Sequence, residues 1–219
     1  MADPIPPEYL PPPGPIDATL KLWKDLTRFY RVHPAIYMEA QFNPSPKGNA
    51  RFSPLPDATG TIISTLYAGT TLDCALMETV FHNVPAIPGP KSVSQADSID
   101  GKVSSALQLT TSLTLIDLRT IALKKMGTDR LHLIDTESSL YPASRQWASR
   151  LYAEFPKAQG MFWTSRQDDS ATSFVLFGPR IPTGVLTVDQ PATSLTLPDN
   201  SPRMDIIELA QRLGVDIVP

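Results

Sequence analysis

Five polar side chains with the potential to bind or react stand in apolar or turn-rich stretches of the sequence. Arg51 precedes an aromatic residue in a proline-rich segment, and Tyr67 lies near the end of a predicted strand. Glu78 is surrounded by apolar residues on a predicted helix, and Ser165 and Arg166 follow an apolar strand. Together they form a candidate site for an anion and a ribose. Taken singly, each has a plainer interpretation as a surface cation, a core residue, a solvent-facing carboxylate or a strand cap.

The standard signatures of nucleotide, metal and hydrolase sites are absent. The sequence has no G-x-G-x-x-G, no Walker A lysine motif, no His-Glu-x-x-His and no G-x-S-x-G. His33, His82 and His132 are scattered, so we expect each to be structural and expect no metal site. Cys74 is the single cysteine, cannot form an internal disulfide, and is expected to be a buried structural thiol.

The composition is that of a folded protein in an aqueous compartment. Of 219 residues, 42% are apolar and 19% are charged. The net charge of −3 argues against a nucleic-acid binder, which usually carries a basic surplus. No signal peptide and no apolar run long enough for a membrane helix is visible. We therefore expect a cytoplasmic protein without membrane contact, although export by a non-classical route would leave the same sequence.

Turn-forming residues and apolar spacing divide the first half of the chain into predicted elements. Seven prolines in residues 1–16 predict an extended arm, either an unstructured leader or a strap over the domain surface. The predictions that follow are a helix over 17–29 capped by Asp17, a strand at 30–33, a brief strand or loop at 50–53, a strand at 62–68, and a helix from Thr70 or Thr71 to near Asn83.

The second half shows a similar mixture. We expect a polar loop at 86–101, strands at 102–109 and 113–118, short and longer helices at 118–126 and 144–155, strands at 161–165 and 172–177, a final strand at 185–188, and an amphipathic helix at 204–213. Strands and helices do not alternate strictly, and no internal repeat is present. This order predicts an α+β fold in one domain with decorated ends.

The order of the separated motifs resembles the RES-domain family. The matching pieces are Arg51-Phe52-Ser53, then 66–71 (LYAGTT), 74–82 (CALMETVFH), 141–148 (YPASRQWA) and 160–166 (GMFWTSR). The segment Tyr30-Arg31-Val32 is similar to the opening strand of the family, and the resemblance covers residues 28–180. The arginine, glutamate and serine that name the family fall on Arg51, Glu78 and Ser165, with Tyr67 as a fourth site residue. Ala50 departs from the glycine that many members carry before the arginine.

The resemblance implies a mixed-sheet fold like that of ADP-ribosyltransferases and the cleavage of the nicotinamide–ribose bond of NAD+. Glu78 would stabilise the cationic ribose and orient the attacking water, and Arg51 and Arg31 would hold the pyrophosphate. Tyr67 would stack on the nicotinamide or ribose, and Ser165 and Arg166 would contact the dinucleotide. NAD+ would be the substrate, with no cofactor and no metal. The implied domain spans residues 17–190, between the arm at 1–16 and a C-terminal extension at 191–219.

Several alternatives remain open from the sequence. Water is the preferred acceptor of the ADP-ribosyl group, followed by inorganic phosphate and then a protein side chain. A non-catalytic nucleotide-binding or interaction module on the same fold is the alternative from another class. The resemblance also implies a toxin that is neutralised by a separate antitoxin or immunity protein. Direct binding of nucleic acid is not expected, and a homo-oligomer is possible.

Overall fold

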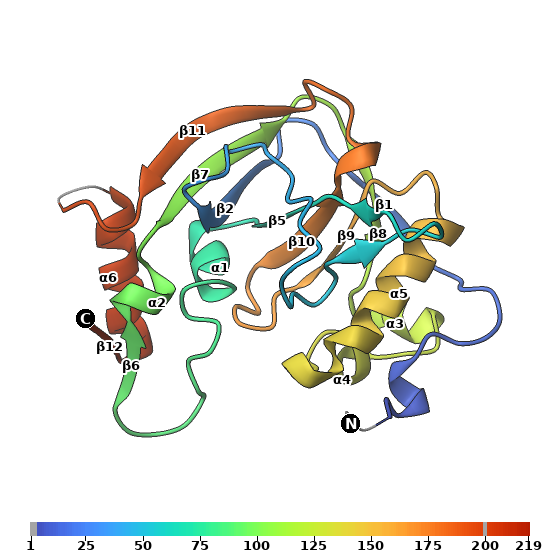
Figure 1. Cartoon of the computed structure of the whole chain (residues 1–219), viewed down its shortest axis with the longest axis horizontal. Coiled ribbons are helices and arrows are strands. Elements are labelled where there is room, and N and C mark those ends of the chain that lie inside the picture. The colour runs from blue at the N-terminus through green and yellow to red at the C-terminus, as the bar shows by residue number, and fades with distance from the viewer. Residues whose placement is uncertain (1–3, 199–200) are drawn as a thin grey trace.

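The computed structural model describes residues 4–198 and 201–219, which are built around one eight-stranded mixed sheet (Figure 1). The order of its strands is β1-β8-β9-β10-β5-β2-β7-β11. Their bounds are β1 Leu20–Trp23, β2 Arg28–Pro34, β5 Thr65–Gly69, β7 Lys102–Leu109, β8 Leu113–Asp117, β9 Gly160–Thr164, β10 Thr172–Phe177 and β11 Leu186–Ser194. β8 and β9 run parallel, and the other neighbours run antiparallel. The predicted α+β class is confirmed.

Two small sheets, six α-helices and three 3-10 turns complete the described chain. The small sheets pair β3 (Leu55–Pro56) with β4 (Ile62–Ile63), and β6 (Lys91–Ser94) with β12 (Val215–Val218). The helices are α1 Leu72–Met77, α2 Gln95–Ser98, α3 Thr120–Lys125, α4 Arg130–Leu133, α5 Tyr141–Glu154 and α6 Ser201–Leu213. The 3-10 turns are η1 Pro7–Tyr9, η2 Ser138–Leu140 and η3 Gly178–Arg180.

Apolar side chains cover both faces of the sheet, because alternate residues of a strand point to opposite sides. Phe162 of β9 and Phe174 of β10 belong to one buried cluster. Their strand neighbours Met161 and Val175 belong to another, which also holds Trp147 of α5. A third cluster joins α1 to α6 beside β2. Figure 1 shows the result: α1 and α6 stand on one side, and α3, α4 and α5 stand on the other, below an arching sheet.

The helix predicted over residues 17–29 is wrong, because this segment forms β1 and the start of β2. β1 pairs antiparallel with β8 at the edge of the sheet. Leu26 has a φ of 61°, a left-handed conformation that an α-helix of L-residues does not contain. Asp17, the expected helix cap, pairs instead with Lys125 at 2.8 Å. The pairing with β8 outweighs a local spacing that is also compatible with a helix.

The helix that carries Glu78 is shorter than predicted. Thr71 caps α1, since its Oγ1 accepts a hydrogen bond from the Cys74 backbone N–H at 3.0 Å. The helix ends at Met77 rather than near Asn83, and the chain continues in tight turns. Glu78 is therefore the C-cap residue, at the point where the chain leaves the helix.

Strand boundaries account for the other corrections. The strand predicted at 62–68 is divided at Ser64 into β4 and β5. The segment 86–101, predicted as a polar loop, contains β6 and α2. The strand predicted at 185–188 is not the final one, since β11 extends to Ser194 and β12 follows α6. The predicted strands at 30–33, 102–109, 113–118, 161–165 and 172–177 are confirmed, as are the helices at 118–126, 144–155 and 204–213, within a few residues.

The proline-rich arm is a strap along α5 over its described part. The indole Nε1 of Trp147 donates to the Tyr9 carbonyl at 3.0 Å, and Arg150 donates to two further carbonyls of the arm. Glu154 accepts a hydrogen bond from the Ile16 backbone N–H at 3.0 Å. Proline supplies no backbone donor, so side chains of the helix satisfy the carbonyls of the arm. Residues 1–3 of the arm lie outside the described residues.

Candidate active site

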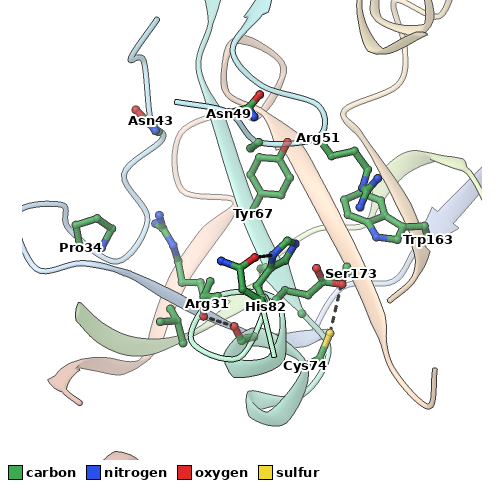
Figure 2. Close-up of a pocket in the computed structure, with 18 of the residues that line it drawn as sticks. Arg31, Pro34, Asn43, Asn49, Arg51, Tyr67, Cys74, His82, Trp163 and Ser173 are labelled. Atoms are coloured by element: carbon green, nitrogen blue, oxygen red, sulfur yellow. Dashed lines mark hydrogen bonds between the residues drawn. The ribbon is translucent and has the colours of Figure 1, made fainter. Parts of the chain in front are cut away.

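A cavity of about 560 Å³ opens between the two helical groups, against β2, β5, β9 and β10. It is lined by Arg31, Val32, Pro34, Asn43, Asn49, Ala50, Arg51, Tyr67, Ala68, Gly69, Cys74, Ala75, Glu78, Thr79, His82, Asn83, Tyr141, Trp163 and Ser173. Figure 2 shows the labelled side chains converging from these separate elements. Four of the predicted site residues, Arg31, Arg51, Tyr67 and Glu78, therefore share one cavity. A space of this size is in the range of small-molecule sites.

Glu78 is held by three donors that converge on one carboxylate oxygen. Its Oε1 accepts hydrogen bonds from Ser165 Oγ at 2.6 Å, Ser173 Oγ at 3.2 Å and the Arg166 backbone N–H at 3.3 Å. The two serines come from either side of the β9–β10 turn, and Glu78 comes from the end of α1. Charge-assisted hydrogen bonds of this kind fix the orientation of a carboxylate. The other oxygen, Oε2, has no hydrogen-bond partner among the described residues and is free to face a ligand.

Ser165 lies behind the carboxylate rather than in the cavity lining. It is 1% exposed, and its hydroxyl donates to Glu78 while accepting from the backbone N–H groups of Gln167 and Asp168 at 3.1 and 3.0 Å. The direct contact with the dinucleotide that the sequence suggested therefore does not fit this geometry. The structure gives Ser165 the roles of orienting Glu78 and closing the turn that follows β9.

Arg51 reaches the cavity from the loop between β2 and β3 and is 7% exposed. Its Nη1 donates to Thr136 Oγ1 at 2.7 Å, and its Nη2 approaches the Tyr141 hydroxyl at 3.4 Å. Its guanidinium carbon also lies 4.8 Å from the centre of the Tyr141 ring. Burial lowers the pKa of Arg51, while the charges of Tyr141 and Glu78 act in the opposite direction. The arginine is therefore a pre-oriented buried cation.

Arg31 is a second buried cation in the lining and is 6% exposed. Its Nη1 donates to the backbone carbonyls of Met38, Glu39 and Gln41, which holds the loop after β2 in place. Its Nε is buried without a hydrogen-bond partner. Burial lowers the pKa of Arg31 to about 10, so the side chain remains charged at neutral pH. An unpaired donor on a buried cation is costly unless a ligand satisfies it, and this favours an anion at Arg31.

Aromatic rings form a wall of the cavity that also holds the cations and the carboxylate. Tyr67 and Trp163 meet edge to face with ring centres 6.5 Å apart, and Tyr141 lines the same space. The Tyr67 hydroxyl accepts a hydrogen bond from the Phe52 backbone N–H at 3.0 Å, which ties the wall to the loop that carries Arg51. Burial raises the pKa of Tyr67 to about 12, so the phenol stays neutral. Rings in this arrangement can receive a planar base or a sugar face.

Arg166 lies outside the cavity lining. Its side chain donates to the Thr136 carbonyl at 2.9 Å and pairs with Glu137 at 3.0 Å. Thr136 thus receives both Arg51 and Arg166, so the segment before α5 is fixed between them. Arg166 is not among the residues that line the cavity, and its contacts with Thr136 and Glu137 support a positioning role.

The histidines and the cysteine divide into structural residues and one residue of the site. His33 is buried and bonds Ser105, and burial lowers its pKa to about 4, so it is neutral. His132 pairs with Asp129 at 2.8 Å in α4. Cys74 is buried, and burial raises its thiol pKa to about 11, in line with the structural role expected of it. His82, also expected to be structural, lines the cavity instead.

Several residues of the site were not singled out from the sequence, among them Thr136, Tyr141, Trp163, Ser173 and His82. Ser173 occupies an inward position of β10, in a run of apolar residues where a buried hydroxyl is unusual. His82 follows Glu78 by four residues, a spacing that places side chains on one face of a helical turn. Both signals are present in the sequence, but neither is specific. Thr136 has no recognisable signal, because its contact with Arg51 joins segments 85 residues apart.

Replacing Ser173 by alanine should lower the rate of the nicotinamide–ribose cleavage that the family resemblance implies about tenfold, the effect of losing one hydrogen bond to a charged group. The variant removes a donor to Glu78 Oε1 but leaves Ser165 in place. Ser173→Thr keeps the hydroxyl and should retain most of the turnover. Ser144→Ala is the matched control, since Ser144 is a buried serine of α5 outside the cavity. Equal turnover of the folded Ser173→Ala and Ser144→Ala variants would remove Ser173 from the support of Glu78.

Comparison with models of known families gives a match over most of the chain. A model of the RES domain matches residues 28–199. The chain belongs to the RES-domain family. The match begins at the first residue of β2 and extends beyond β11, so all the cavity-lining residues lie inside it. No curated protein matches the sequence.

Among solved structures, the fold of this RES domain is similar to a chain from the crystal structure of the M. tuberculosis MbcT–MbcA toxin–antitoxin complex. The TM-score is 0.57 at 16% identity, and the alignment covers 90% of this chain and 92% of that chain. At this identity the likeness concerns the fold. Within the described residues, no helix is long and apolar enough to cross a membrane, and no three metal-binding side chains gather into a site.

Proposed function

We propose that this RES domain cleaves the bond between nicotinamide and ribose in NAD+, with water as the acceptor. The main support for this proposal is the carboxylate of Glu78, which three hydrogen-bond donors orient. The same cavity is lined by the buried cations Arg31 and Arg51. A dinucleotide diphosphate matches the two cations, and a planar base matches the aromatic wall.

The proposed cleavage reaction requires few protein groups. Positive charge builds on the ribose as the bond to nicotinamide breaks, as in glycoside hydrolysis. A fixed carboxylate beside the ribose stabilises that charge without reorganising at the moment of reaction. The pyridinium nitrogen of nicotinamide takes the bonding electrons and leaves as a neutral ring. The proposal therefore needs no cofactor and no metal, and Glu78 supplies the charge that the transition state requires.

Binding would be divided between the cations and the aromatic wall. Arg31 offers its unpaired Nε to an anion, and Arg51, which is held by Thr136, lines the same cavity. Tyr67 and Trp163 form the surface against which the base or the ribose would rest. Inorganic phosphate and a protein side chain remain the other acceptors for the same site, and the product identifies the acceptor.

In a cell this reaction would make the protein a toxin that a second protein must restrain. The structural neighbour comes from a toxin–antitoxin complex, and this supports an antitoxin partner for the present chain. The simplest neutralising partner would cover the cavity around Arg51 and Glu78. No part of the described chain does so, because the arm packs on α5 and α6 packs beside α1.

Expression of the chain alone in a bacterium should deplete NAD+ and arrest growth, whereas Glu78→Gln should be harmless at the same soluble level. Growth and the cellular NAD+ content are measured together after induction. The proposal fails if the wild-type protein accumulates in soluble form while growth and NAD+ both equal those of the variant.

A further inference from the structure

His82 occupies the cavity without a function in the scheme above. The residue lines the cavity and is half-buried, four residues after Glu78 along the chain. In the view of Figure 2 its ring lies between Tyr67 and Ser173, and a dashed line joins it to a neighbouring oxygen. The backbone at His82 is fixed as well, since Gln167 Nε2 donates to the His82 carbonyl at 3.0 Å.

The hydrogen bonds of the His82 ring determine which of its nitrogens can accept a proton. His82 Nδ1 lies 3.0 Å from Asn83 Oδ1, an oxygen that can only accept. Nδ1 must therefore carry the proton in this contact. In the neutral ring the other nitrogen, Nε2, is then a hydrogen-bond acceptor and a base. Among the described residues Nε2 has no hydrogen-bond partner, so it is available to a ligand in the cavity.

The carboxylate of Glu78 is poorly placed to act as that base. Its Oε1 already accepts three hydrogen bonds, from Ser165, Ser173 and the Arg166 backbone. These three donors already engage the lone pairs of Oε1, so this oxygen has no room to accept the proton of a water. The second oxygen, Oε2, is then the one that stabilises the positive charge on the ribose. Cleavage by water nevertheless releases one proton. A second group that accepts this proton leaves Glu78 ionised to stabilise the ribose.

We infer that His82 is the general base that accepts the proton of the attacking water. This inference rests on the proposed NAD+ cleavage. The water oxygen forms a bond to the anomeric carbon of the ribose as the carbon–nitrogen bond to nicotinamide breaks. The electron pair of that bond stays on the pyridine nitrogen, which becomes neutral. One water proton passes to His82 Nε2, and the half-exposed imidazolium returns it to solvent. NAD+ and water thus give ADP-ribose, nicotinamide and one proton.

A general base is often oriented by a neighbouring hydrogen-bonding group. Here Asn83 fixes the tautomer and the ring plane of His82. Asn83 lines the cavity too. The amide oxygen of Asn83 accepts from Nδ1 and so leaves Nε2 as the ring nitrogen that can accept a proton.

The test compares His82→Ala and His82→Gln with wild type, using purified full-length protein and steady-state release of nicotinamide from NAD+. Both variants should lose about 100-fold in kcat with little change in KM, in the range of general-base effects. Glutamine offers a hydrogen-bond acceptor but no base, so it should not rescue. Added imidazole should restore turnover to His82→Ala in proportion to its concentration, and should not restore Glu78→Gln.

His132→Ala is the matched control, since His132 pairs with Asp129 in α4 outside the cavity lining. Its turnover should equal that of wild type, and thermal melting establishes that each variant is folded. Full turnover of His82→Ala or His82→Gln, a loss confined to KM, or a loss that imidazole leaves unchanged overturns the inference. Absence of nicotinamide release by wild type is a different result, because it overturns the proposed function itself.

Discussion

Glu78→Gln should keep the fold and lose about 10²–10³-fold in kcat, with NAD+ affinity close to that of wild type. Glutamine has the shape of glutamate, and its Oε1 can still accept the hydrogen bonds of Ser165 and Ser173. It cannot balance a positive charge on the ribose, so the cost falls on the transition state and not on the bound substrate. Nicotinamide release gives kcat, and calorimetry on the variant gives the affinity.

Glu208→Gln provides the control for this change. Glu208 is an exposed residue of α6, and its replacement removes a carboxylate without touching the cavity. Its kcat should match that of wild type. A folded Glu78→Gln protein with the same turnover as Glu208→Gln would eliminate Glu78 from the chemistry and leave it as a structural C-cap of α1.

Arg51→Ala should weaken NAD+ binding by about 2–4 kcal/mol, the range for loss of paired hydrogen bonds to a charged group. This corresponds to about a 30- to 700-fold increase in Kd. The same change also removes the bonds to Thr136 and Tyr141, so some loss of folding stability will accompany it. Arg51→Lys separates the two effects, because lysine retains the charge but cannot form a paired contact. Its affinity should lie between those of wild type and the alanine variant.

Arg119→Ala is suited as the control arginine, since Arg119 pairs with Asp117 and packs over Phe162 outside the cavity. Calorimetry should show unchanged affinity for NAD+ in this variant. If Arg51→Ala also binds NAD+ with the affinity of wild type, Arg51 stabilises its loop and does not bind the ligand.

Local sequence signals predicted the central strands because their side chains alternate or form short apolar runs. They failed at residues 17–29, where Leu22 and Leu26 recur at helical spacing but the partner strand β8 lies about 90 residues away along the chain. No local pattern records such a pairing. The extension of β11 to Ser194 was missed for a similar reason, since its exposed residues pair with β7 but carry no apolar alternation.

The candidate site could be predicted from the sequence in part. Residue type and surroundings singled out Arg51, Tyr67 and Glu78, the family resemblance added Arg31, and the fold brings all four to one cavity. Ser165 and Arg166 were assigned to the ligand, but they lie behind Glu78 and Thr136. A motif records that a residue is needed near a site. Only geometry distinguishes a residue that touches the ligand from one that orients its neighbour.

Release of nicotinamide from NAD+ by the purified wild-type protein is the most direct test of the proposed activity. A time course with the products separated by mass spectrometry should show nicotinamide and ADP-ribose in equal amounts, with and without inorganic phosphate. The parallel reaction with Glu78→Gln should be slower by the factor given above. A folded wild-type protein that leaves NAD+ intact under both conditions would contradict the account. A product carrying an added phosphate would contradict water as the acceptor.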